Sequence, residues 1–246
     1  MTRHADLPFD LPAVTPAARR RAARLYALLH EAYPDAHCEL TYANPHELLI
    51  ATILSAQSTD AGVNKATPAL FARFPTPADF ARATPADIEP YIRSLGFFRA
   101  KAKAVHASMT TLVERFNGRV PRTMADLLTL RGVARKTANV VLGNAFNIHD
   151  GIPVDTHVER LSKRFCLAPH DATVPMIERH LMALFPRHDW GMVSHLLIWH
   201  GRRACKARGP ACADHPVCQS FGECCERRAP SSPRPRNKKA TLRKRR

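Results

Sequence analysis

Acidic residues, glycine and alternating β-branched runs are scarce in this 246-residue sequence. It has 21 Asp/Glu against 37 Lys/Arg, which gives a formal net charge of +16. Lys and Arg contacts with phosphates release condensed counterions, so an anionic polymer is the expected partner. Few segments are rich in valine or threonine at every second position, which argues against a β-sheet. With 45% hydrophobic residues the chain can still bury a core.

Long apolar runs are also missing. The longest, residues 48–54, is interrupted by Thr52 and is far too short to span a bilayer. The N-terminal segment carries Arg3, Asp6 and Asp10 and lacks the apolar stretch of a secretory signal. We therefore expect a soluble, intracellular protein with no membrane association. Seven cysteines in such a protein favour metal or redox chemistry over disulfides.

The positive charge is concentrated at the C-terminal end. Residues 227–246 contain ten Lys/Arg and no Asp/Glu, so the other 226 residues carry a net charge of only +6. Two interpretations remain open for this tail: a solvated, disordered segment, or a segment that weakly attracts nucleic acid. Residues 1–14 are also expected to be disordered.

Capping residues mark several helix starts. Proline follows a cap at Thr15, Asn44, Thr76 and Thr84, and proline at the first helical position has no amide hydrogen to lose. Short connections and helical periodicity predict an all-α fold. The expected helices lie near residues 16–33, 45–57, 60–73, 77–82, 85–92, 98–116, 123–129, 134–146, 155–165, 174–185 and 188–201.

The run Leu130–Lys136 predicts a tight turn that opens a helix. Gly132 can adopt a backbone conformation that residues with a Cβ resist. Successive amides at the start of the next helix would then form an anion site that suits a phosphate. The alternative is an ordinary corner between two helices with an exposed lysine.

Lys136 and Asp155 form a candidate catalytic pair. The positive end of the helix dipole and neighbouring Arg135 both disfavour protonated Lys136, and a neutral amine is the nucleophile that a Schiff base requires. Asp155 precedes an apolar-periodic stretch and is therefore a predicted helix N-cap, whose carboxylate would lie at a helix start. Capping alone is the other interpretation of Asp155.

Three motifs in this order resemble those of the endonuclease III family: Leu130–Val141, Val154–His157 and Leu54–Asp60. The resemblance runs from about Leu48 to Cys224. It implies a bifunctional DNA glycosylase and AP lyase that removes oxidised pyrimidines from duplex DNA. Lys136 would attack C1′ of the damaged nucleoside and Asp155 would balance the developing positive charge. β-Elimination from the Schiff base would then cut the strand.

The resemblance also implies residues that touch DNA. Gln57 would fill the gap left by the extruded nucleotide, and Phe97 stands where the family usually has a leucine wedge, although a core aromatic is an alternative for Phe97. The hairpin departs from the family's Leu-Pro-Gly-Val-Gly at two positions, with Arg131 in place of the proline and Ala134 in place of the second glycine. The full set of expected DNA contacts is Gln57, Phe97, Arg131, Gly132, Ala134, Arg135, Lys206 and Arg208.

Five of the seven cysteines fall between residues 205 and 225. Such clusters hold iron–sulfur centres or zinc. The resemblance implies a [4Fe–4S] cluster, although the middle gap of the family's Cys-x6-Cys-x2-Cys-x5-Cys pattern is three residues longer here. The expected ligands are Cys205, Cys212, Cys218 and Cys224, with Cys225 as an alternative to Cys224. His215 lies at the x2 position, but using it as a ligand would displace Cys218 and spoil the final gap. Zinc is the alternative metal. Cys38 and Cys166 are expected to be buried packing residues.

The fold implied has two helical domains that flank a DNA-binding cleft. Residues 41–152 would form one domain with the helix–hairpin–helix motif, and residues 15–40 with 153–226 the iron–sulfur domain. We expect a cytoplasmic, nucleoid-associated monomer. Two other functions compete with this one: a monofunctional adenine glycosylase, which lacks the hairpin lysine, and a non-catalytic helix–hairpin–helix or redox protein, which the pairing of Lys136 with Asp155 disfavours.

Overall fold

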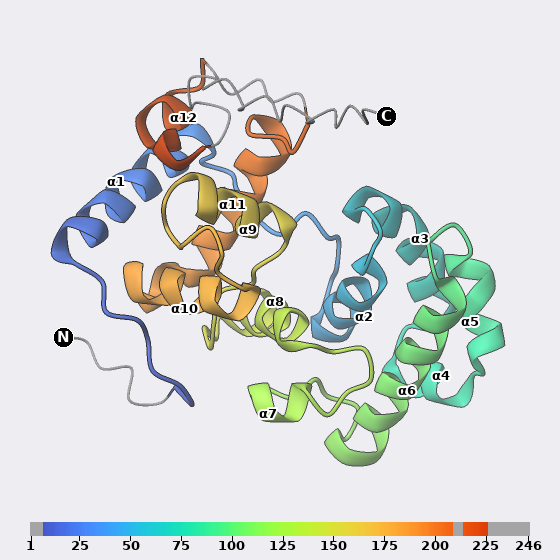
Figure 1. Ribbon diagram of the computed structural model, residues 1–246. Coiled ribbons are helices and arrows are strands. Elements are labelled where there is room, and N and C mark those ends of the chain that lie inside the picture. Colours follow the sequence, from blue (N-terminus) through green and yellow to red (C-terminus); the bar gives the residue numbers. More distant parts are fainter. Residues whose placement is uncertain (1–6, 209–213, 226–246) are drawn as a thin grey trace, which may run out of the picture.

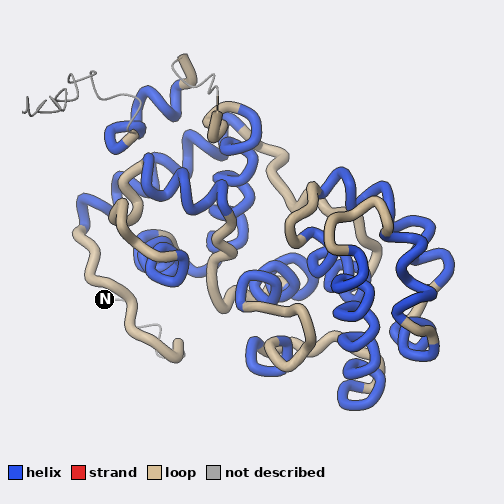
Figure 2. The backbone as a smooth tube through the Cα atoms, turned by 45° about the vertical axis from the view of Figure 1, so that its right-hand side comes forward, coloured by secondary structure: helices blue, strands red, loops and turns tan. Residues whose placement is uncertain are grey.

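The computed structural model describes residues 7–208 and 214–225, and within these ranges it contains only helices and loops (Figure 2). The expected all-α fold is therefore confirmed. None of the described helices is long and apolar enough to cross a membrane. The predicted C-terminal tail, residues 227–246, lies outside the described residues.

One hydrophobic cluster joins the N-terminal helix to the C-terminal helices, which lie side by side in one half of the molecule (Figure 1). Its largest fully buried side chains are Trp190 and Phe165. Residues before position 37 and after position 151 build this cluster, so chain segments far apart in sequence share one core. Its elements are α1 (Pro16–Ala32), α9 (Thr156–Arg164), α10 (Val174–Leu184), η1 (Arg187–Asp189), α11 (Trp190–Arg203), α12 (Pro216–Phe221) and η2 (Gly222–Cys224).

A second hydrophobic cluster is built from the middle of the chain, residues 40–142. Its central helix is α2, which is buried along most of its length and packs against α3, α6 and α8. Figure 1 shows α8 between this half of the molecule and the first one. The elements are α2 (Pro45–Ser55), α3 (Asp60–Arg73), α4 (Pro77–Arg82), α5 (Pro85–Ile92), α6 (Phe98–Phe116), α7 (Met124–Leu127) and α8 (Arg135–Phe146).

The capping signals explain where these helices begin. Asn44 accepts a hydrogen bond from the Glu47 amide at 3.0 Å, and the Glu47 carboxylate accepts one from the Ala43 amide at 2.7 Å. Thr76 and Asp79 form a reciprocal capping box at the start of α4. Each cap satisfies amides that the first helical turn leaves without a partner. The start of every proline-marked helix therefore coincides with its prediction.

The expectation of disorder at residues 1–14 is wrong for residues 7–14. Leu7, Phe9, Leu11 and Val14 pack, partly buried, against the first hydrophobic cluster. The Phe9 ring lies beneath the guanidinium of Arg135 at 5.1 Å and that of Arg179 at 4.5 Å. Four apolar side chains in eight residues supply the burial that holds this segment in place. Residues 1–6 lie outside the described part of the chain.

Candidate active site and cysteine region

The hairpin turn is anchored by apolar side chains on either side of Gly132. Leu130 and Val133 are buried, and Gly132 has a φ of 82°. A Cβ on Gly132 would lie 3.1 Å from the Ala104 Cβ, so the turn packs closely against α6. Ser108, also on α6, donates a hydrogen bond to the Arg131 carbonyl at 2.6 Å. Glycine is thus needed both for the backbone conformation and for the contact.

The helix that follows this turn opens without a side-chain cap. Ala134 is the N-cap of α8, has an extended backbone (φ −96°, ψ 171°) and gives no side-chain hydrogen bond. The first amides of α8 therefore keep their donors for another partner. Lys136 lies in this first turn and its side chain is exposed. Unsatisfied amides and the positive end of the helix dipole together favour an anion at this position.

Lys136 and Asp155 line the same cavity, which has a volume of about 320 Å³. Asp155 is the N-cap of α9 and accepts hydrogen bonds from the amides of His157 and Val158, both at 2.8 Å and both through Oδ1. Asp155 is therefore both the cap of α9 and a residue of the cavity wall. The cavity therefore combines an amine and a carboxylate that come from the starts of two different helices.

An ion-pair network at the rim of the cavity joins the two hydrophobic clusters. Arg202, near the end of α11, donates to Asp60 at 2.8 Å and also pairs with Glu39. Arg203 donates to Glu39 at 2.8 Å. Burial opposes ionisation of Glu39, but the hydrogen bonds from Arg203 and Arg202 outweigh it and lower the pKa of the carboxyl. The sequence interpretation missed Glu39 and Arg202, because neither belongs to a recognisable motif.

Gln57 and Phe97 are both exposed and both have left-handed backbones. Their φ angles are 52° and 57°, and 67% of the Phe97 side chain is accessible. The alternative interpretation of Phe97 as a core aromatic is therefore wrong. A Cβ on Gly96 would lie 3.7 Å from the Gln57 carbonyl oxygen, so the two loops are neighbours. A large apolar side chain held in solvent by a strained backbone is typical of a contact surface.

Arg135 is oriented differently from the expectation that it contacts DNA. Its Nε lies 2.9 Å and 3.1 Å from the two carboxylate oxygens of Glu178, and its Nη2 donates to the Asp150 carbonyl at 3.0 Å. Glu178 is 6% exposed and also accepts from Asn139 at 2.9 Å. Arg135 therefore points toward α10, the helix that carries Glu178. An acid between the apolar residues Ile177 and Leu181 was the available signal for this pair.

The other expected DNA contacts lie at the surface. Arg131, Gly132, Ala134, Lys206 and Arg208 are all exposed. The first three belong to the hairpin turn, whereas Lys206 and Arg208 follow α11 in the other half of the molecule. These positions are therefore accessible to a macromolecule.

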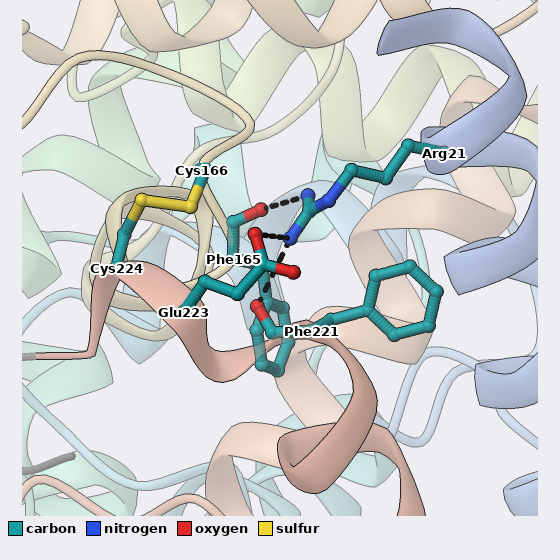
Figure 3. The surroundings of a disulfide bond; sticks show 6 residues. All are labelled: Arg21, Phe165, Cys166, Phe221, Glu223 and Cys224. Carbon is teal, nitrogen blue, oxygen red and sulfur yellow. Dashed lines mark hydrogen bonds and ion pairs between the residues drawn. A yellow bond between two sulfur atoms is a disulfide. The ribbon is translucent and has the colours of Figure 1, made fainter. Parts of the chain in front are cut away.

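The cysteine region differs from its prediction in one pairing. Cys224 is bonded to Cys166, with their Cα atoms 5.6 Å apart (Figure 3). Cys166 is exposed, not buried, and the expectation that it stands alone is wrong. Arg21 brings the two segments together by donating to the Phe165 carbonyl at 2.6 Å and the Phe221 carbonyl at 3.2 Å. Cys224 in this state is not a metal ligand.

A group that could hold a metal ion remains in this region. The ligand atoms of His200, Cys205 and Cys218 lie within 4.8 Å of one another, and all three residues are buried. The Arg164 guanidinium donates to the Cys205 sulfur at 3.1 Å, and the Tyr33 hydroxyl oxygen lies 2.9 Å from His200 Nδ1. Cys212 lies outside the described residues, and Cys225 is a buried thiol. Cys38 is half-buried and packs against the second hydrophobic cluster, and burial raises the pKa of its thiol.

Comparison with known proteins agrees with this fold and site. Residues 50–187 match the HhH-GPD superfamily of base excision DNA repair proteins, which is more than half of the chain. The chain is therefore a member of the HhH-GPD superfamily, and the hairpin turn lies within the matched residues. Endonuclease III of Synechocystis sp. is 51% identical over 197 residues, which cover 80% of this chain and 89% of that protein.

Further relatives support the same placement. Endonuclease III of Escherichia coli K12 is 41% identical over 78% of this chain and 91% of that protein. A trapped covalent endonuclease III–DNA intermediate has a TM-score of 0.80, with 41% identity over 86% of this chain and 98% of the other. A non-covalent endonuclease III–DNA complex has the same TM-score, covering 86% of this chain and 97% of the other. The chain belongs to the endonuclease III family.

Proposed function

We propose that this chain is a base-excision repair DNA glycosylase with AP lyase activity, in which Lys136 is the nucleophile and Asp155 the assisting carboxylate. The observation that carries the proposal is that both residues line one cavity of about 320 Å³ between α8 and α11. Membership of the endonuclease III family supports the same chemistry, and oxidised pyrimidines in duplex DNA are the substrates that it implies.

The reaction requires an amine and a carboxylate in distinct roles. The lone pair of the Lys136 Nζ attacks C1′ of the damaged nucleoside, and the electrons of the breaking glycosidic bond leave with the base. Asp155 stabilises the positive charge that develops on the sugar and accepts and returns protons. Opening of the sugar ring gives a Schiff base at Lys136. Loss of a proton from C2′ then expels the 3′ phosphate and cuts the strand.

The DNA would lie across the exposed face that carries the hairpin turn and the loops of Gln57 and Phe97. The uncapped amides of α8 would bind a backbone phosphate, with Arg131 and Ala134 beside them. Gln57 and Phe97 would enter the stack when the damaged nucleotide is extruded. Lys206 and Arg208 would contact the backbone from the other half of the molecule. Arg135 would not join these contacts, because its side chain pairs with Glu178.

The cysteine region would hold a [4Fe–4S] cluster through Cys205, Cys212, Cys218 and Cys225. Cys205 and Cys218 are buried thiols that converge, and the Arg164 guanidinium donates to one of them, as thiolate ligands of a cluster require. With Cys224 bonded to Cys166, Cys225 is the remaining buried thiol among the described residues of this loop. A bound cluster would supply a covalent cross-link that fixes the segment carrying Lys206 and Arg208.

Elemental analysis of the purified protein tests the ligand set. We expect iron and sulfide in wild type, and a loss of iron in Cys225→Ser but not in Cys224→Ser. Zinc in place of iron, or iron lost only in Cys224→Ser, would contradict the assignment.

The two hydrophobic clusters would be the cores of two domains, residues 41–152 and residues 15–40 with 153–226. Between them lies the cavity that Lys136 and Asp155 share. We further propose that the protein acts as a monomer in the cytoplasm, where nucleoid DNA is its substrate.

Borohydride trapping tests the proposed chemistry. Wild type should form a covalent adduct with duplex DNA that contains thymine glycol or an abasic site, and Lys136→Ala should form none. Lys65→Ala, which removes an exposed lysine of α3, is the matched control and should trap like wild type. Asp155→Asn keeps an N-cap but lowers the rate by roughly 10²- to 10³-fold. An adduct that survives Lys136→Ala would overturn the proposal.

A further inference from the structure

Lys101 is a buried lysine outside the cavity. It lies in the first turn of α6, is 5% exposed, and its Nζ donates to the Ser58 Oγ at 2.7 Å. Burial lowers the pKa of its amine. Lysine is almost never fully buried unless it is paired, and a hydroxyl is a weak partner for an ammonium group. A methionine of similar length would fill the same space without the cost of desolvating an amine.

The side chain of Lys101 is attached to the turn that presents Gln57. Ser58 follows Gln57 directly, and its amide donates to the Ser55 carbonyl at 3.0 Å, which closes a tight turn after α2. Gln57 sits in that turn with a φ of 52°. A non-glycine residue persists in this region only where its surroundings determine the backbone. The hydrogen bond from Lys101 to Ser58 joins α6 to this turn.

The backbone of the same lysine is attached to the loop that presents Phe97. The Lys101 amide donates to the Phe97 carbonyl at 3.0 Å, the first hydrogen bond of α6. Phe97 is also left-handed, with a φ of 57°. Gly96, beside it, approaches the Gln57 carbonyl closely enough that an added Cβ would be in van der Waals contact. One residue therefore connects two neighbouring, exposed and strained positions.

We propose that Lys101 is a positioning residue that fixes Gln57 and Phe97 relative to each other, so that both enter the DNA stack as one rigid unit. The inference rests on the proposed function, because it assigns a purpose to the Lys101–Ser58 contact only if Gln57 and Phe97 fill a vacated stack. Its advantage is preorganisation: two side chains that must insert together lose less conformational entropy when their backbones are already fixed.

The test compares a substrate that needs insertion with one that does not. Lys101→Met removes the amine but keeps the buried volume, and Lys103→Met, on an exposed position of the same helix, is the matched control. The first substrate is duplex DNA with a single thymine glycol, and the second is single-stranded DNA with a preformed abasic site. We expect Lys101→Met to slow single-turnover cleavage of the duplex about 10- to 100-fold. Borohydride trapping on the single strand should stay at the wild-type rate.

Stability separates positioning from a merely structural role. Lys101→Met should unfold at the same temperature as wild type or higher, because the buried amine is replaced by an apolar group. Ser58→Ala should reduce the duplex rate in the same direction, and Lys103→Met should change nothing. Equal losses on both substrates, a lower unfolding temperature, or an unchanged duplex rate would each overturn the inference. A wild-type protein that traps neither substrate would instead overturn the proposed function, and this inference with it.

Discussion

The hairpin region and the cysteine region place their functional groups by different means. Lys136 and Asp155 each owe their position to a helix start only one or two residues away, and the two starts meet in one cavity. Cys224, in contrast, is held by Cys166, 58 residues earlier in the chain. Local signals can be recognised along a sequence, whereas a pairing across that distance depends on the packing of whole helices. We therefore expect the cavity to tolerate changes in the turn, and the cysteine region to depend on the packing around it.

The ion pair of Arg135 with Glu178 makes the hairpin region depend on long-range packing after all, and removing it should have the largest effect. Glu178→Ala leaves a guanidinium and the Asn139 amide without their shared acceptor. We expect the free energy of unfolding to fall by about 4 kcal/mol, measured by urea denaturation.

The matched control for this prediction is a surface pair. Glu159→Ala removes the partly exposed partner of Lys163, one turn apart on α9, and should cost less than about 0.5 kcal/mol. Similar losses in the two variants would show that the Arg135–Glu178 contact is no stronger than a solvated ion pair. The hairpin region would then depend on local helix starts and the cysteine region on long-range pairing.

Removing the disulfide should have the next largest effect and tests the cysteine region directly. Cys166→Ser should lower the free energy of unfolding by about 3 kcal/mol under oxidising conditions, because the bond restricts the unfolded chain. Reductant should destabilise wild type to the level of the variant and leave the variant unchanged. Cys38→Ser is the control, and it should keep the response to reductant. A wild-type protein insensitive to reductant would mean that Cys224 is available to a metal.

Exchanges in the turn should have the smallest effect, and they differ between two neighbouring positions. Gly132→Ala introduces a Cβ at a φ of 82° and against Ala104, so we expect a loss of about 1–2 kcal/mol and weaker DNA binding. Ala134→Gly restores the family's second glycine at a position whose backbone is extended.

We expect Ala134→Gly to change stability by less than about 0.5 kcal/mol, because the extended N-cap backbone suits either residue. Urea denaturation and fluorescence anisotropy with an abasic duplex measure both variants. A large gain in DNA affinity from Ala134→Gly would show that the methyl group obstructs docking, and the turn would then be less tolerant than we conclude.

Much of the fold was predictable because its signals are local. The bounds of α3, α4, α5 and α6 coincide with their predictions, and a cap or a proline marks the starts of α3, α4 and α5. The turn and Asp155 as an N-cap followed from the same reasoning. The helix α12 was missed, because six residues are too few to show a periodic pattern.

Orientation and pairing were less predictable. The direction of Arg135 depends on the face of α8 that meets α10, and the order at residues 7–14 depends on a core assembled from distant helices. Cys166 gave no signal of its own, because its partner is brought close by contacts of Arg21. Side-chain direction and long-range pairing are properties of the assembled core, and a single sequence does not display them.

The position of Phe9 has a consequence for how this chain can vary. Its ring covers Arg135 and Arg179, and Arg135 in turn pairs with Glu178 and precedes Lys136 in the chain. A substitution at any one of these positions alters the environment of the next. The N-terminal segment is thus coupled, through these side chains, to the start of the helix that carries Lys136.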